Sequence, residues 1–256
     1  MDSRGTEHPE SAPPSLTELF SHYVKNADIQ AADYGTGLVE PYDSGVSHPV
    51  DAGLAWQGAV ASLASIMEPG TRFERPAEWI TLVQSRDSYP AVALAAGNFP
   101  QMLRDLPALL QVENLADLRG TVGPVHELPG LSTWAARTAG GSFVGRLLAA
   151  GVLRLAGQFE HEYLRDDSGL SKLQRLALQN ERAALLWSRG DCDSAVELWQ
   201  ELSDTAIGQF NLGMSALFDK PAQALPFLQT ATKLLADEDP WRHLAGIYLA
   251  LAEMRA

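Results

Sequence analysis

Residues 183–202, AALLWSRGDCDSAVELWQEL, combine two helical segments with a glycine between them. Apolar residues dominate the segment before Gly190, and Ala195 and Trp199 follow it at helical spacing. Glycine is the residue that most often follows a helix end, since it adopts a left-handed backbone without a side-chain clash. The stretch therefore predicts a helix, a short turn at Gly190 and a second helix that runs back along the first.

The same arrangement recurs along the chain. The stretches LAAGNF around Gly97 and RLAGQF around Gly157 also place a glycine between two apolar helical segments. Gly157 and Gly190 are 33 positions apart, close to the roughly 34-residue period of one class of helical repeat. Residues 210–231, FNLGMSALFDKPAQALPFLQTA, and residues 241–248, WRHLAGIY, continue the pattern.

These stretches resemble the tetratricopeptide-repeat family, which places a small residue in its first helix, a glycine before the turn and two alanines in its second helix. The small residues let paired helices approach closely, and a bulky substitute would cost about 1–3 kcal/mol in overpacking. The matching positions are Ala183, Gly190, Ala195 and Trp199, then Leu212, Gly213, Ala224, Leu228 and Ala231, then Trp241, Leu244, Ala245 and Tyr248. The match departs from the family where the turn at Lys220 lacks its glycine and where the proline after the first unit is missing.

The resemblance implies an all-α protein with an antiparallel helix-hairpin solenoid over residues 143–256. A disordered leader is predicted at residues 1–14, and an N-terminal helical part at 15–120 contains a long Gly- and Pro-rich loop at 33–50. Residues 121–142 again carry many Gly and Pro and are interpreted as a linker. A helical bundle without repeats is the alternative fold.

After the linker, helices are expected at residues 143–156 and 159–165.

In the tetratricopeptide-repeat family, which these stretches resemble, partners lie along a concave face lined by the first helix of each pair. The positions carried over are Asn180, Glu181, Ala184 and Trp187, then Phe210, Asn211, Met214 and Phe218, then Arg242, His243 and Gly246. Such a face is apolar and aromatic with amides at its edge, which suits an apolar or amphipathic segment of another protein. The alternative is that the aromatic and methionine side chains are buried against a neighbouring segment, for example the N-terminal half.

The composition of the chain disfavours two classes of binding partner. The chain carries 32 acidic and 19 basic side chains, a formal net charge of −13, which disfavours nucleic acid and anionic lipid. The most apolar stretch, residues 143–156, contains Arg146 and Arg154 and is shorter than the roughly 18–20 residues of a membrane span. The single cysteine, Cys192, is expected to be a small buried hydrophobe. A cytoplasmic protein without membrane insertion is predicted.

Catalytic motifs are not found. No histidine belongs to an HExxH pattern, and neither a GxSxG elbow nor a GKS/GKT phosphate loop is present. The polar cluster at residues 160–167 is interpreted as a solvated face, and neither a metal nor a cofactor is expected. The function predicted is a protein-binding adaptor; a structural subunit of a larger assembly is the alternative. An enzyme that uses the long loop at 33–50, with Asp43, His48 and Asp51 nearby, is the least favoured reading.

Overall fold

The structure, a computed structural model, describes residues 52–84, 128–237 and 240–256, and these residues form helices and no strand. The predicted all-α class is thereby confirmed for the described part of the chain. The helices are α2 (Ala52–Ala61), the 3-10 helix η1 (Ala64–Ile66), α3 (Trp79–Gln84), α6 (Pro129–Ala139), α7 (Phe143–Leu155), α8 (Lys172–Ser188), α9 (Cys192–Gln200), α10 (Ala206–Asp219), α11 (Pro221–Leu234) and α12 (Pro240–Arg255).

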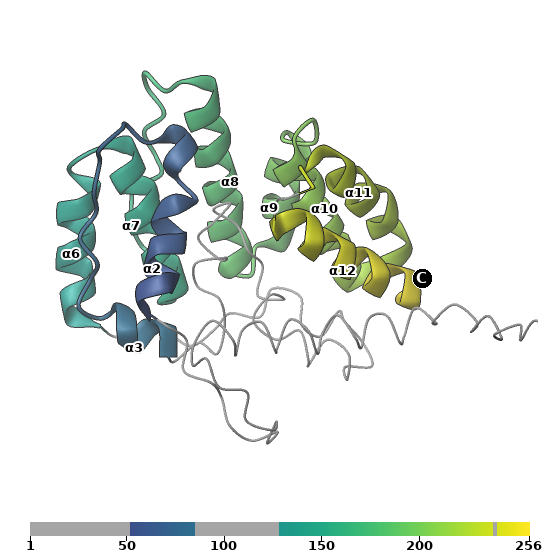
Figure 1. Cartoon of the computed structure of the whole chain (residues 1–256), viewed down its shortest axis with the longest axis horizontal. Helices are drawn as coiled ribbons and strands as arrows, with labels where there is room; N and C mark the ends of the chain where they lie inside the picture. The colour runs from purple at the N-terminus through teal and green to yellow at the C-terminus, as the bar shows by residue number, and fades with distance from the viewer. Residues whose placement is uncertain (1–51, 85–127, 238–239) are drawn as a thin grey trace, which may run out of the picture.

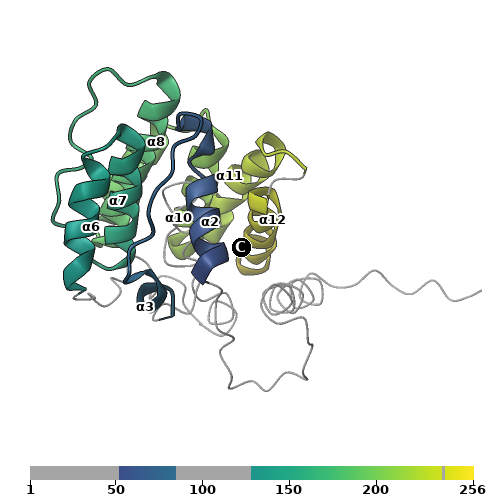
Figure 2. The same ribbon diagram turned by 60° about the vertical axis from the view of Figure 1, so that its left-hand side comes forward.

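Consecutive helices pack against each other. The pairs are α6 with α7, α8 with α9, and α10 with α11, and α12 packs on α11 (Figure 1). In both views α6 and α7 lie on one side of α8, while α10, α11 and α12 lie on the other (Figure 2). The prediction of packed helix pairs in the C-terminal region is confirmed.

Two of the glycine turns identified in the sequence have the same hydrogen bonds. Gly157 and Gly190 have φ angles of 75° and 88°, in the left-handed region that favours glycine. At the end of α8, the Gly190 amide donates to the Trp187 carbonyl, and the next amide donates to the Leu186 carbonyl, both at 3.0 Å. The end of α7 repeats these two bonds around Gly157. Both helices therefore end in a Schellman motif.

The small residues of the repeat pattern lie where helices cross. Ala195 and Ala224 are fully buried. A Cβ atom added at Gly213 of α10 would lie 2.5 Å from Cγ of Leu228 on α11. The close approach of α10 to α11 therefore depends on the missing side chain at Gly213.

The segment predicted as a linker, residues 121–142, contains helix α6 (Pro129–Ala139), which packs on α7. Pro129 occupies the first turn, where its missing N–H costs nothing. Leu131, Trp134 and Ala135 then follow at helical spacing and are buried. Glycines and prolines at the helix ends concealed this periodicity.

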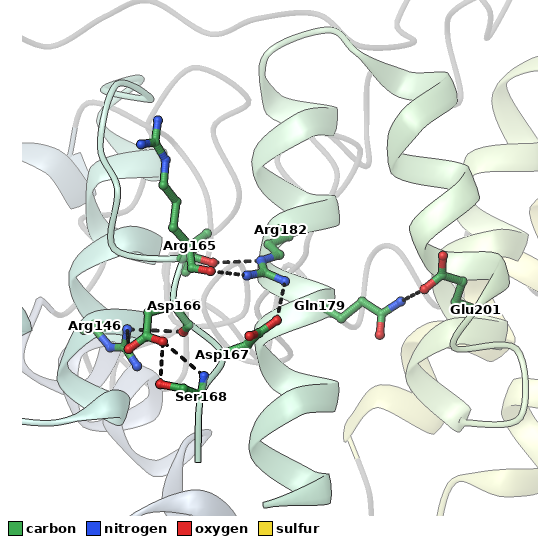
Figure 3. A network of polar contacts seen from close by, with 9 residues as sticks. Arg146, Arg165, Asp166, Asp167, Ser168, Gln179, Arg182 and Glu201 are labelled. Atoms are coloured by element: carbon green, nitrogen blue, oxygen red, sulfur yellow. Dashed lines mark hydrogen bonds and ion pairs between the residues drawn. The ribbon is translucent and has the colours of Figure 1, made fainter. Parts of the chain in front are cut away.

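The helix predicted at residues 159–165 is wrong, because this segment belongs to an irregular connector between α7 and α8. Arg182 of α8 donates from Nε to the Leu164 carbonyl at 2.7 Å and from Nη2 to the Arg165 carbonyl at 2.8 Å. Arg146 of α7 contacts the carbonyl and carboxylate of Asp166 (Figure 3). Bonds from neighbouring helices thus replace the local bonds of a helix.

Three tryptophans pack together and connect helices α2, α3 and α6. Trp56 of α2 lies 5.2 Å from Trp79 and 6.1 Å from Trp134 between ring centroids, edge to face in both cases. Trp79 donates its indole N–H to the Ala52 carbonyl, and Trp134 donates to the Glu74 carbonyl. Aromatic packing and satisfied indoles hold α2 and α3 against α6.

The leader at 1–14 and the loop at 33–50, with Asp43, His48 and Asp51, lie outside the described residues. Within those residues, no helix is both long enough and apolar enough to cross a membrane. Cys192 is buried, as expected for a small packing residue.

Candidate functional site

Six of the eight residues chosen as the partner-binding set are buried in the C-terminal helices. They are Asn180, Trp187, Phe210, Asn211, Met214 and Phe218. The Trp187 ring lies 5.5 Å from the Phe218 ring, and the Phe210 ring lies 5.7 Å from the Trp241 ring. The aromatic face is therefore a closed core rather than an open groove. Within the described residues, the ring neighbours of these side chains come from α8, α9, α10 and α12.

The other two residues of that set, Arg242 and His243, lie apart on α12. They line a polar hollow of about 320 Å³ together with Thr232, Asp237, Gly246 and Ile247. Arg242 forms an ion pair with Asp237 and donates to the Leu235 carbonyl. The structure thus separates the eight residues into a core and a surface hollow, and their contact with a partner stays a prediction.

An apolar pocket of about 180 Å³ lies where η1, α7, α8 and the start of α10 meet. Its lining residues are Ser62, Leu63, Ser65, Ile66, Leu147, Leu148, Leu173, Leu176, Ala177, Asn180, Glu181, Leu202, Thr205 and Ile207. Leu173 and Ile207 are 57% and 40% exposed. The pocket is therefore apolar inside, and two of the large side chains that line it remain in contact with water.

Helix α8 supplies one continuous wall of this pocket. Leu173, Leu176, Ala177 and Asn180 are spaced at i, i+3, i+4 and i+7, so they share one face of the helix. The Ser171 hydroxyl and the Gln174 side chain form a capping box that fixes where α8 begins. The helical spacing is present in the sequence, but the residues that match the repeat pattern begin at Ala183. The contribution of residues 62–66 had no sequence signal.

A buried ion pair lies at the inner wall. Arg154 of α7 donates from Nε to Oε1 of Glu181 at 2.8 Å and from Nη2 to Oε2 at 3.4 Å. Burial raises the pKa of the Glu181 carboxyl above its usual value, and the Arg154 charge and hydrogen bond oppose that rise. Charge neutralisation by Arg154 lets a carboxylate line an apolar pocket.

Asn180 joins three helices beside this pair. Its Oδ1 accepts from the Trp199 indole N–H of α9 and from the Asn211 amide of α10, both at 3.1 Å. All three side chains are buried. Asn180 is therefore held in one orientation, and the wall that it shares with Glu181 is preorganised.

The acidic residues of the connector between α7 and α8 pair individually with arginines. Glu160 pairs with Arg189, Glu162 with Arg165, Asp166 with Arg146 and Asp167 with Arg182. Among the residues that the structure describes, no group of three or more metal-ligating side chains is found. Burial lowers the pKa of His161, which stacks on Tyr163, while Glu160 opposes the shift. The pocket at α8 is thus the better candidate site.

Comparison of this chain with protein-family models, with curated proteins and with solved structures finds no match.

Proposed function

We propose that this protein is an adaptor that binds a segment of another protein, and that an apolar side chain of that segment enters the pocket between η1, α7, α8 and α10. The observation that carries the proposal is the exposure of Leu173 and Ile207 at the edge of an apolar pocket. Covering such side chains is favourable by about 25 cal/mol for each Å² of apolar area removed from water. Exposed apolar side chains beside a hollow are typical of interaction sites.

The size of the pocket supports a single inserted side chain. An apolar cavity of roughly 150 Å³ is enough to hold a benzene-sized molecule, and this pocket measures about 180 Å³. An amphipathic helix offers one such anchor and places neighbouring apolar residues one turn away. Those neighbours would cover Leu173 and Ile207 while the anchor fills the pocket.

The tetratricopeptide-like resemblance supports the same function. In that family the first helix of each pair lines the partner-binding face. Here α8 and α10 are the first helices of successive pairs, and they carry Leu173 and Ile207. We therefore propose a tetratricopeptide-like helical repeat whose binding face has shifted from the buried aromatic positions to the α8 pocket.

The test compares two double variants of the full chain. Leu173→Asp with Ile207→Asp places charge at the pocket edge, whereas Ile80→Asp with Leu234→Asp alters two other exposed apolar residues. Proteins captured from cells that contain the chain are measured by quantitative mass spectrometry, after circular dichroism has shown that both variants fold. The first variant is expected to lose a partner that the second retains.

Retention of every wild-type partner by the Leu173→Asp, Ile207→Asp variant would show that the pocket is not the binding site. Sedimentation of the isolated wild-type chain addresses the alternative of a structural subunit. Self-association that the same variant abolishes would make the pocket an assembly contact between copies of this chain.

A further inference from the structure

The inner wall of the apolar pocket presents a carboxylate. Glu181 lines the pocket with a side chain that is 4% exposed, whereas the paired Arg154 side chain is 0% exposed and does not line it. Of the buried pair, the negative partner is therefore the one that lines the pocket. Apolar residues such as Leu147, Leu176 and Ile66 line the same pocket.

This carboxylate can accept a further hydrogen bond. An ionised carboxylate has about four lone-pair sites, and Arg154 donates one bond to each of the two Glu181 oxygens. A donor that arrives in a site sheltered from water makes a stronger bond than it would in solvent. A purely aliphatic group would instead displace water from the carboxylate without replacing its hydrogen bonds.

Resting on the proposed function, we propose that the side chain that enters the pocket is a tryptophan of the partner protein, whose ring N–H donates to Glu181. The pocket volume of about 180 Å³ exceeds the roughly 150 Å³ that a benzene-sized molecule needs. A buried indole N–H usually requires an acceptor. Within the described residues, Trp79, Trp134 and Trp199 each donate their indole N–H to an oxygen, whereas the buried Trp187 Nε1 makes no hydrogen bond.

The test uses two probes of nearly identical shape. Indole carries the ring N–H, and 1-benzofuran has an oxygen in its place. Each is titrated into the full chain labelled with ¹³C in its Leu and Ile methyl groups. Leu147, Leu176 and Ile207 report on the pocket, and the fully buried Leu251 of α12 serves as a remote reference.

Both probes are expected to shift the pocket methyl resonances and to leave Leu251 unchanged. Indole is expected to bind about tenfold more tightly, which is what one added hydrogen bond to a charged group supplies. The double variant Arg154→Met with Glu181→Leu removes the acceptor and retains the fold, since apolar residues of similar volume can replace a buried ion pair. In this variant the preference for indole should disappear while 1-benzofuran still binds.

Equal affinity of the two probes for the wild-type chain would overturn the tryptophan inference and leave the proposed binding pocket intact. Persistence of the tenfold preference in the double variant would also overturn it, because Glu181 would not be the acceptor. If neither probe shifts the pocket methyl resonances, the pocket of the proposed function is wrong as well. Pocket resonances that shift with protein concentration alone would identify a second copy of this chain as the occupant.

Discussion

Arg154 of α7 and Glu181 of α8 form an ion pair whose Nε and Oε1 atoms lie 2.8 Å apart, with side chains that are 0% and 4% exposed. The pair joins consecutive helices that belong to different hairpins. Removing two charges from water costs several kcal/mol for each ion, which their attraction must offset. The pair is therefore a poor source of stability, but loss of one partner leaves an uncompensated buried charge.

Loss of one residue of the ion pair should destabilise the protein more than loss of both. Arg154→Met alone should destabilise the protein by about 3–5 kcal/mol, because it leaves the Glu181 carboxylate buried without its counter-charge. Arg154→Met with Glu181→Leu should be close to the wild type or more stable, because no charge then remains. Urea unfolding followed by circular dichroism measures both. Equal destabilisation by the single and double variants would show that packing, and not charge, dominates at this site.

The second prediction concerns pH. Burial raises the pKa of Glu181 in the folded protein above its usual value, so the folded state binds more protons than the unfolded state at pH values between the two pKa values. Stability from this group therefore falls as pH rises through that window. The free energy of unfolding of the Arg154→Met, Glu181→Leu variant minus that of the wild type should increase from pH 4 to pH 7. A constant difference across this range would contradict the raised pKa.

The third prediction compares two helical glycines. Gly213→Ala should destabilise the protein by about 1–2 kcal/mol, because its Cβ would lie 2.5 Å from Leu228 Cγ and overpack the crossing of α10 and α11. Gly246→Ala in α12 should stabilise it by about 0.5–1 kcal/mol, since nothing lies within 4 Å of the added Cβ and alanine favours the helix. Thermal unfolding of both variants tests the contrast. Stabilisation by both would mean that α10 and α11 do not cross at Gly213.

The fourth prediction concerns the connector between α7 and α8. Arg182→Met keeps the aliphatic stem but removes the bonds to the Leu164 and Arg165 carbonyls, so we expect a loss of about 1–2 kcal/mol. Hydrogen exchange of the connector amides should accelerate. Arg165→Met is the matched control, because that side chain is 75% exposed and its pair with Glu162 lies at the surface. Equal acceleration in both variants would assign the effect to lost charge.

The candidate site was only partly visible in the sequence. The repeat pattern predicts that Asn180 and Glu181 lie on the concave face, and in the structure both residues line the pocket. Leu176 and Leu173 lie on the same helical face one and two turns before Asn180, but they precede the residues that match the repeat pattern. Residues 62–66 complete the pocket from far away in the chain, and no local pattern predicts such a contact.

Local physics alone determined the helix pairs of this protein. Gly157 and Gly190 end helices because only glycine adopts their positive φ without strain, and the small residues at Ala195, Gly213 and Ala224 permit close helix crossing. These effects act within a few residues or within one hairpin, so the sequence displays them directly.

Tertiary structure alone decided which apolar face is closed and which is open. Helical periodicity shows that Phe210, Phe218 and Leu173 are apolar positions, but it does not show what covers them. In the folded chain, rings from α8 and α12 cover the two phenylalanines, while Leu173 remains 57% exposed beside a pocket. Burial depends on the summed contacts of segments distant in sequence, and for that reason the proposed binding face could not be distinguished from the buried face by the sequence alone.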